Sequence, residues 1–376
     1  MLADGFDWWE EALDMNIPPS VWESLKERKN KAIELDETRC TPIAVKFGGM
    51  DFQLMPTGAA GGREFVLINE SYRIEMSSPN KGWCIKWRAT NAALWEGRIA
   101  DIREILYAAL AEAGCTPSEN NPDDYIRLSR VDYCFDIHSK AFTRQMYPDI
   151  VYNTVCPSET KARGDFVVQG TQLETLTIGM ASSCQVQIYD KTKEITEASN
   201  KTWLYDIWAV DTETGEIGED IKADVWRLEI RLKKDWLKSR KVNRPDAFMS
   251  KLGECLADAL YNRRLCQRTG DSNRRRWPLH PLYSMALDRI GNPQEFLPID
   301  RRPTGRRSEL VRIVRQNMAG SLRSLTTLLL LERGAFDEEE AERLAKTIFL
   351  QMLNDPEHEE KIRRAGEKYA LVDAAK

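Results

Sequence analysis

The chain has 376 residues, 42% of them hydrophobic and 30% charged, which is enough apolar material for a core in one large or two medium domains. No run of about 18 apolar residues exists, and the acidic N-terminus lacks the pattern of a secretory signal. Eight scattered cysteines form no CxxC pair, which argues against a zinc site and is typical of reduced thiols. We expect a cytoplasmic protein that has no membrane partner.

The net charge of −5 conceals an uneven distribution along the chain. Residues 222–315 contain 23 Lys and Arg against 11 Asp and Glu, a net charge of +12, so the remainder carries −17. A basic segment within an acidic chain is typical of binding to nucleic acid, although charge runs are more often solvated helix faces.

The first third is predicted to pass from helix to strands and back to helix. Residues 5–35 have a helical periodicity whose apolar face includes Trp8, Trp9 and Leu13. In residues 42–90, short apolar runs are separated by Gly, Pro and Asn, which predicts several strands. Residues 91–113 carry an apolar stripe that predicts a helix.

The rest of the chain is predicted to hold three longer strand segments and then helices. The strand segments are 126–138, a hairpin at 173–190 that turns at 180–183, and 225–233. Residues 196–220 are predicted to be a helix and a loop, 247–266 one helix, and 270–307 an irregular basic linker. Three more helices are expected at 308–333, 337–353 and 356–371.

This pattern predicts an α+β fold, with a mixed or antiparallel β-sheet domain, flanking helices and a helical C-terminal region. The expected domains are an N-terminal helical segment at 1–40, the sheet domain at 41–245, a basic helix and linker at 246–307, and the helical region at 308–376.

Three of the predicted strands have one apolar and one polar face, because alternate side chains of a strand point to opposite sides. The polar faces together carry Asp132, Asp136, His138, Tyr189, Lys191, Arg227, Glu229 and Arg231. A polar sheet face is ordinarily solvated and held by cross-strand ion pairs, so no single strand indicates chemistry by itself.

Gathered on one sheet, these residue types suit the cleavage of nucleic acid. Carboxylates bind Mg²⁺ or Mn²⁺, and such an ion polarises a scissile phosphate. A tyrosine hydroxyl can attack the phosphorus and form a covalent phosphotyrosine. Arginine and lysine hold the neighbouring phosphates and offset the charge that develops in the transition state.

Four motifs, in order, resemble the trans-acting Rep family of plasmid and phage rolling-circle replication initiators, which is related to tyrosine relaxases of integrative elements. The resemblance covers about residues 40–240. Its motifs are Tyr72-Arg-Ile-Glu-Met-Ser before a Trp-rich strand and a helix, Ser129-Arg-Val-Asp-Tyr-Cys-Phe-Asp136, Thr177-Ile-Gly-Met-Ala-Ser-Ser with Ile188-Tyr-Asp-Lys191, and Trp226-Arg-Leu-Glu-Ile-Arg-Leu-Lys233.

The resemblance implies a nickase that cuts one strand at a double-strand origin, forming a 5′-phosphotyrosine at Tyr189 and a 3′-OH primer. Residues 41–245 would then be the catalytic domain. Lys191, Arg227 and Arg231 would contact the scissile phosphate or its neighbours. Asp132 and Glu229 would be the main Mg²⁺ or Mn²⁺ ligands, with Asp136 a third.

The resemblance also implies partners and a setting. Origin DNA would bind as duplex and as the single-stranded nick site. A host or element helicase would separate the strands, because the sequence has no phosphate-loop motif. The need to cut twice favours a homodimer. The expected setting is the cytoplasm of a bacterium, on a plasmid, phage or integrative element.

The sequence departs from its wider class in the metal motif. Many tyrosine nickases use a His-hydrophobic-His motif, but the three histidines here are far apart, at 138, 280 and 358. We therefore expect carboxylate ligands, with His138 a possible substitute. Met-Ala-Ser follows Ile178-Gly179 where the family pattern has a basic or serine-rich turn. The other candidate nucleophiles are Tyr152, Tyr205 and Tyr283.

The basic segment is expected to grip the duplex origin through its phosphates, which gives affinity without sequence choice. Trp277 could stack on a base there, although a buried Trp is the more usual outcome. The predicted DNA-binding residues are Lys233, Lys234, Arg240, Lys241, Arg274, Arg275, Arg276, Arg301, Arg302, Arg306 and Arg307.

Three other functions remain open at this point. A conjugative relaxase would use the same chemistry for transfer. A DNA-binding regulator without catalysis would be unaffected by Tyr189→Phe. A metal-dependent nuclease that uses water would cleave DNA without a covalent adduct.

Overall fold

The computed structural model describes residues 1–35, 42–78, 82–120, 122–143, 153–155, 163–169, 172–210, 221–291, 343–347 and 350. The chain divides into two compact units, Met1–Pro303 and Thr304–Lys376. In the second unit the described residues are helical and fall within the helix predicted at 337–353. The helices predicted at 308–333 and 356–371 lie outside the described residues. None of the described helices is long and apolar enough to cross a bilayer.

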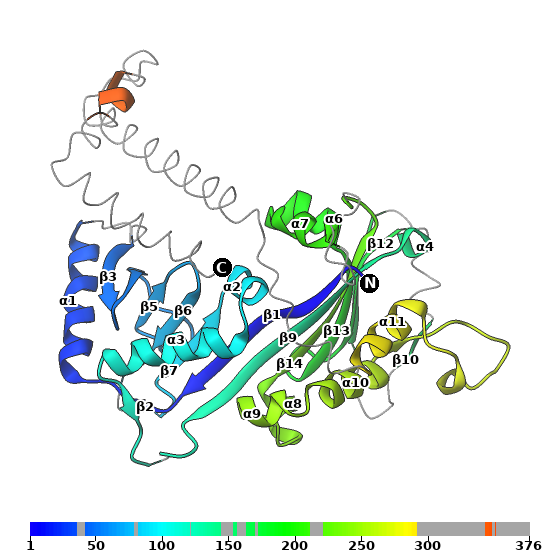
Figure 1. Cartoon of the computed structure of the whole chain (residues 1–376), viewed down its shortest axis with the longest axis horizontal. Coiled ribbons are helices and arrows are strands. Elements are labelled where there is room, and N and C mark those ends of the chain that lie inside the picture. The colour runs from blue at the N-terminus through cyan, green and yellow to red at the C-terminus, as the bar shows by residue number, and fades with distance from the viewer. Residues whose placement is uncertain are drawn as a thin grey trace. The chain divides into compact units, whose positions relative to one another are not determined.

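An antiparallel sheet of eleven strands is the frame of the first unit, in the order β11-β12-β13-β14-β9-β1-β7-β6-β5-β4-β3 (Figure 1). This confirms the predicted α+β class and selects the antiparallel alternative. The strands are β1 Ala3–Leu13, β3 Ile43–Phe47, β4 Met50–Leu54, β5 Phe65–Ile68, β6 Tyr72–Met76, β7 Ile85–Ala89, β9 Ile126–His138, β11 Arg163–Gln169, β12 Gln172–Gly179, β13 Cys184–Asp190 and β14 Val225–Lys233. Short pairs lie outside this sheet: β2 Met15–Asn16 with β8 Thr116–Pro117, and β10 Thr154–Val155 with β15 Arg264–Leu265.

The helix predicted from residue 5 is wrong for its first half, because Ala3–Leu13 is a strand at the centre of the sheet. Trp9 and Leu13 are four residues apart, a spacing that places two side chains on one face in a helix and in a strand alike. Trp9 and Leu13 are fully buried, and Glu11 lies between them on the same face. The predicted helix does exist farther on, as α1 Pro19–Leu35. The domain boundaries remain predictions, although β1 belongs to the main sheet.

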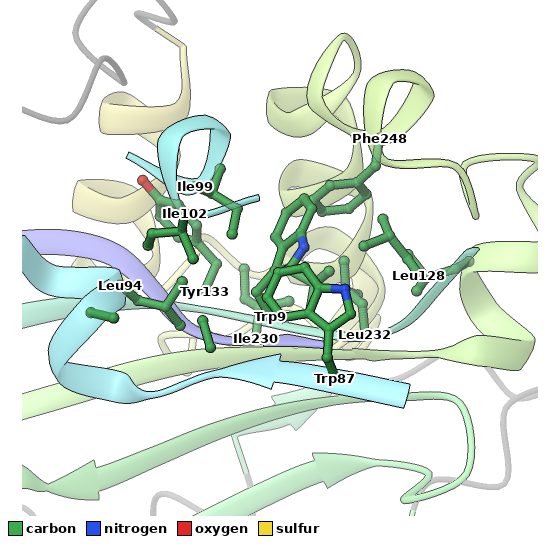
Figure 2. Close-up of a cluster of buried hydrophobic side chains, with 14 of the residues drawn as sticks. Trp9, Trp87, Leu94, Ile99, Ile102, Leu128, Tyr133, Ile230, Leu232 and Phe248 are labelled. Atoms are coloured by element: carbon green, nitrogen blue, oxygen red, sulfur yellow. The ribbon is translucent and has the colours of Figure 1, made fainter. Parts of the chain in front are cut away.

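Helices cover the two faces of the sheet differently. The apolar face packs against α3 Ile99–Glu112, α8 Lys234–Ser239, α9 Pro245–Met249, α10 Leu252–Asn262 and α11 Pro281–Ile290. Figure 2 shows Trp9 and Trp87 of the sheet beside Phe248 of α9 and Ile99 of α3. A second, smaller core lies on the other face, at the end where β9 finishes. It includes Trp95 of α2 Asn91–Glu96, Ile195 of η1 Ile195–Ser199, and Leu204 and Trp208 of α7 Trp203–Ala209, next to α6 Lys191–Glu194.

Two of the predicted helical segments differ from the structure. The single helix predicted at 247–266 is divided into α9, α10 and the short strand β15, with a break at Ser250–Lys251. The break lets Phe248 meet the ring of Trp9, at 6.0 Å between centroids, while Leu256 and Leu260 of α10 reach the same core. The predicted linker 270–307 contains the 3₁₀ turn Arg274–Arg276 and the helix α11, and 292–307 lie outside the described residues.

Gly179 ends β12 in the hairpin that the sequence predicts. Its φ is +114°, and a Cβ there would come within 2.3 Å of the Cys184 carbonyl oxygen. Only glycine fits this backbone and this approach. The hairpin turns at Met180–Ser183 as expected, and it pairs Thr175 with Tyr189 and Thr177 with Gln187.

His280 is a buried cap at the start of α11, and its Nδ1 accepts a hydrogen bond from the Leu282 backbone N–H at 3.3 Å. Burial lowers the pKa of His280 to about 4. A folded-state pKa below the ordinary value near 6.5 contributes stability above that value, and this stability is lost as the pH falls from about 6.5 toward 4.

We expect His280→Asn to lose less stability than the wild type when the pH is lowered. Asparagine caps a helix but does not titrate. The difference in unfolding free energy between the two proteins should change by about 2 kcal/mol between pH 7 and pH 5, at about 1.36 kcal/mol per unit. Urea unfolding at both pH values measures it, and parallel pH profiles of the two proteins would contradict the assignment.

Candidate active site

The sheet register brings the predicted site residues onto one polar face. Cross-strand partners lie side by side on the same face of a sheet. One row joins Tyr189 of β13, Arg227 of β14 and Asp136 of β9. The next row along the strands contains Gln187, Glu229 and Cys134, and the third contains Gln185, Arg231 and Asp132.

Tyr189 and Glu229 are in contact on this face. The Tyr189 hydroxyl donates a hydrogen bond to Glu229 Oε2 at 2.8 Å, and Arg231 Nε donates to Glu229 Oε1 at 2.7 Å. Burial and the negative charge of Glu229 raise the pKa of Tyr189 well above its ordinary value. Tyr189 is therefore a neutral phenol at pH 7, with a carboxylate in place to accept its proton.

Asp132 lies one row farther along, next to Glu229. Arg130, two residues earlier on β9, binds both of its carboxylate oxygens, and Arg231 Nε lies 3.9 Å from its Oδ2. Burial, helped by the charge of Glu229, raises the pKa of Asp132 to about 7, although both arginines oppose the shift. One guanidinium, that of Arg231, thus lies between the two carboxylates.

Arg227 is fully buried and forms a cross-link between three strands. Its Nε donates to Asp136 Oδ1 at 2.6 Å, its Nη2 to Asp136 Oδ2 at 2.8 Å, and its Nη1 to Asp7 Oδ1 of β1 at 2.7 Å. Trp208 of α7 also donates to Asp136 Oδ2, at 2.9 Å. The prediction that Arg227 contacts phosphate is replaced by a structural role, because its side chain is 0% exposed.

Lys191 starts α6 directly after β13, beside Tyr189. Its Nζ donates to Glu194 Oε2 at 2.5 Å and lies 5.6 Å from the centre of the Tyr189 ring. Burial and the charge of Arg227 lower the pKa of Lys191. The structure thus places this cation next to the predicted nucleophile, in a buried position.

The four predicted metal ligands do not converge on one point. Asp132 and Asp136 are four residues apart on β9, about 13 Å at 3.3 Å per residue, and His138 lies at the exposed end of the strand. Among the described residues, no group of three or more His, Cys, Asp or Glu side chains could hold a metal ion. Asp132 and Glu229, which share Arg231, are the pair that remains. Mg²⁺ is usually held by one or two carboxylates together with substrate phosphates, and this pair fits that pattern.

The predicted DNA-binding residues are divided between different parts of the molecule. Lys233 ends β14 on the same face as Tyr189, whereas α8 belongs to the layer on the apolar face. Lys234, at the start of α8, and Lys241, just after its end, are exposed. Arg240 Nη2 lies 2.7 Å from Asp258 Oδ2 and forms an ion pair with it.

The remaining basic residues of that prediction have several outcomes. Arg274 donates to the Thr154 carbonyl at 2.7 Å, whereas Arg275 and Arg276 are exposed. The idea that Trp277 stacks on a base is wrong, because Trp277 is 5% exposed and donates to the Asp271 carbonyl. Arg301, Arg302, Arg306 and Arg307 lie outside the described residues.

Asp7 belongs to this site but was not predicted from the sequence; it lies in a bulge of β1 between Phe6 and Trp8. Asn91 Nδ2 donates to its Oδ1 at 2.6 Å. Burial alone would raise the pKa of Asp7, but the charges of Arg227, Lys201 and Lys191 hold it below the ordinary value. The signal was hidden because this segment was interpreted as a helix. Arg130 was also not among the predicted site residues, but the sequence could have indicated it. It is two residues before Asp132 and therefore on the same strand face.

The other candidate tyrosines are less suited to act as the nucleophile. Tyr283 is fully buried in the apolar core and donates to the Arg263 carbonyl at 2.7 Å. Tyr205 packs against Trp208 on α7. Tyr152 lies outside the described residues. Of the three described candidates, Tyr189, Tyr205 and Tyr283, Tyr189 is the one whose hydroxyl donates to a carboxylate on the polar sheet face.

Comparison with solved structures finds a rolling circle replication initiator protein from Geobacillus stearothermophilus, with a TM-score of 0.39 and 15% sequence identity. The match covers 76% of this chain and 96% of that chain. No protein-family model and no curated protein sequence matches the chain. A structural likeness at this level carries no argument about activity, which has to be inferred from the site itself.

We expect Asp136→Ala to destabilise the protein by about 3–5 kcal/mol, because it removes a main partner of the buried Arg227 charge. His138→Ala, two residues farther on the same strand face but exposed, should change stability by less than about 0.5 kcal/mol. Urea unfolding of both variants measures this. Equal stability of the two variants would show that the Arg227 cross-link does not stabilise the sheet.

Proposed function

We propose that the chain is a DNA strand-nicking replication initiator that cleaves one strand at a double-strand origin. Cleavage would link Tyr189 to the 5′ phosphate and release a 3′-OH that primes synthesis. One observation carries the proposal: the Tyr189 hydroxyl donates to Glu229 at 2.8 Å on a sheet face that also holds Arg231, Lys191 and Asp132. The order of the sequence motifs supports it.

The chemistry follows from the protonation states of these groups. Because the pKa of Tyr189 is raised, the hydroxyl has to lose its proton as its oxygen attacks the phosphorus. Glu229 Oε2 would accept that proton. The P–O3′ bond breaks on the opposite side of the phosphorus, and the departing 3′ oxygen takes a proton from solvent. The charge of Arg231 would offset the negative charge on the phosphate oxygens.

Asp132 and Glu229 are the residues that would hold a Mg²⁺ or Mn²⁺ ion. Such an ion, when bound, polarises the scissile phosphate. Arg130 and Arg231 neutralise these carboxylates in the structure, so they would have to share them with the ion. Asp136 and His138 are not part of this proposal, because their positions along β9 are too far from Asp132.

The partners follow from the same proposal. Origin DNA would be recognised as duplex and cut as single strand, and a separate helicase would open the duplex behind the nick. A round of replication needs two cuts, one at its start and one at its end. The proposed site of each chain contains one candidate nucleophile, Tyr189, so a homodimer would supply the second tyrosine.

A covalent-trapping assay tests the chemistry. Purified protein is mixed with labelled single-stranded oligonucleotides tiled over the DNA that flanks its own gene, with Mn²⁺, and the products are separated on a denaturing gel. We expect a protein–DNA adduct in the wild type, its complete loss in Tyr189→Phe, and its retention in the control Tyr205→Phe. Loss of the positioned base in Glu229→Gln should slow adduct formation by a factor of about 100 or more.

The other outcomes separate the competing functions. Cleavage without an adduct would mean a nuclease that uses water, and tight binding of duplex without any cut would mean a regulator. An adduct that forms equally well in EDTA would overturn the metal proposal. A conjugative relaxase forms the same adduct, and it is distinguished by whether a plasmid with the nick site is transferred between cells or replicated.

A further inference from the structure

A cross-strand row of four basic side chains and one glutamate extends over five neighbouring strands on the face that carries Tyr189. The register pairs Lys233 of β14 with Arg130 of β9, Arg130 with Glu10 of β1, Glu10 with Arg88 of β7, and Arg88 with Arg73 of β6. Strands in a sheet are about 4.8 Å apart, so this cross-strand row is about 19 Å long. We call the four basic residues of this row, Lys233, Arg130, Arg88 and Arg73, the basic ladder.

The ladder contains more positive charge than its surroundings neutralise. Arg130 is bound to Asp132, Arg73 Nε donates to Glu75 at 2.7 Å, and Glu10 pairs with Lys86 at 3.1 Å. Within the described part of the chain, neither Arg88 nor Lys233 has a carboxylate at ion-pair distance. Burial and the charges of Arg73 and Arg130 lower the pKa of Arg88, and burial and Arg130 lower that of Lys233. Both cations would therefore be stabilised by an anion.

Trp8 holds two of the guanidinium groups in fixed positions. Its ring lies on β1, and the guanidinium carbons of Arg88 and Arg130 are each 4.2 Å from the ring centre. Because β7 and β9 flank β1, the two arginines approach Trp8 from opposite neighbouring strands. A stacked guanidinium keeps its N–H edge available, so Arg88, which has no described carboxylate at ion-pair distance, offers preformed donors for phosphate oxygens.

We propose that the basic ladder binds the single-stranded DNA that adjoins the scissile phosphate, leading it from Tyr189 across β14, β9, β1, β7 and β6. This inference rests on the proposed nicking function and adds the path of its substrate. Lys233 is four residues from Glu229 on β14, about 13 Å, so one bound strand can reach both. Along the strands, Asp132 lies on one side of the row and Glu75 on the other, and each is paired with an arginine of the row.

The test measures binding separately from cleavage. A labelled 20-nucleotide oligo(dT) is titrated with protein at several salt concentrations, and fluorescence anisotropy gives the affinity and its salt dependence. Each lost phosphate contact should reduce the slope of log K against log salt by about 0.7, so the double variant Arg88→Ala with Lys233→Ala should lose about 1.4. Loss of two charge-assisted contacts should weaken binding at least about tenfold.

Matched variants keep this test independent of folding and of catalysis. Lys46→Ala removes an exposed lysine from the same sheet face on the edge strand β3, and it should leave the slope unchanged. Arg88→Lys keeps the charge and should keep most of the slope, which separates phosphate binding from damage to the Trp8 stack. Tyr189→Phe should bind oligo(dT) as the wild type does.

Each outcome decides one of the two proposals. An unchanged slope in the double variant would overturn the ladder, even if the wild type forms the covalent adduct. An equal loss of affinity for a 20-base-pair duplex would also overturn it, because the ladder would then be a general duplex surface. A reduced slope for oligo(dT) without any adduct in the wild type would support the ladder and contradict the nickase.

Discussion

The buried guanidinium of Arg227 ties together the end of the sheet on which the candidate site depends. It donates to Asp136 of β9 and to Asp7 of β1, while its own strand, β14, pairs with the strand of Tyr189. A charge in this position is costly unless it is paired and hydrogen-bonded, and here the two carboxylates and Trp208 complete the network. Register on three strands is thereby fixed, because a slip of one residue would leave these charges unpaired.

This constraint explains how one face of a large sheet can hold several buried charged side chains. The apolar face is covered by α3 and by α8 to α11, so it supplies the hydrophobic stabilisation. Among the described residues, the helices on the polar face, α2, α6 and α7, lie at one end of it (Figure 1), together with η1. Along the strands, that face passes from the buried Arg227 row to the Glu229 row, the Arg231 row and then the partly exposed ladder. Burial of the first row raises the pKa of Tyr189, and partial exposure of the last leaves arginines within reach of a ligand.

The carboxylates of the face have different roles, although they have the same chemistry. Asp136 and Asp7 are acceptors for a buried arginine, and Glu229 accepts from Tyr189 and Arg231. Asp132 is held by Arg130 next to Glu229, with a pKa of about 7. What distinguishes them is position along a strand, since two residues of displacement move a side chain by about 7 Å on the same face.

The sequence alone determined the strands that carry the site and the side chains on their polar face. Period-2 alternation in β9 and β14 is unambiguous, so their bounds and faces were predicted correctly. The alternation did not reveal β1. Trp9 and Leu13 fit the period of a helix as well as that of a strand, and a charged residue, Glu11, lies between them on the buried face. Glu11 is accommodated there by hydrogen bonds from Trp9, Arg103 and Tyr107, which come from both neighbouring and distant segments.

Only the tertiary structure decided which polar residues meet. Strand order and register place β1 between β9 and β7, and β14 beside β9. That arrangement gives Arg227 its partners Asp136 and Asp7, and it aligns Arg73, Arg88, Arg130 and Lys233 in one row.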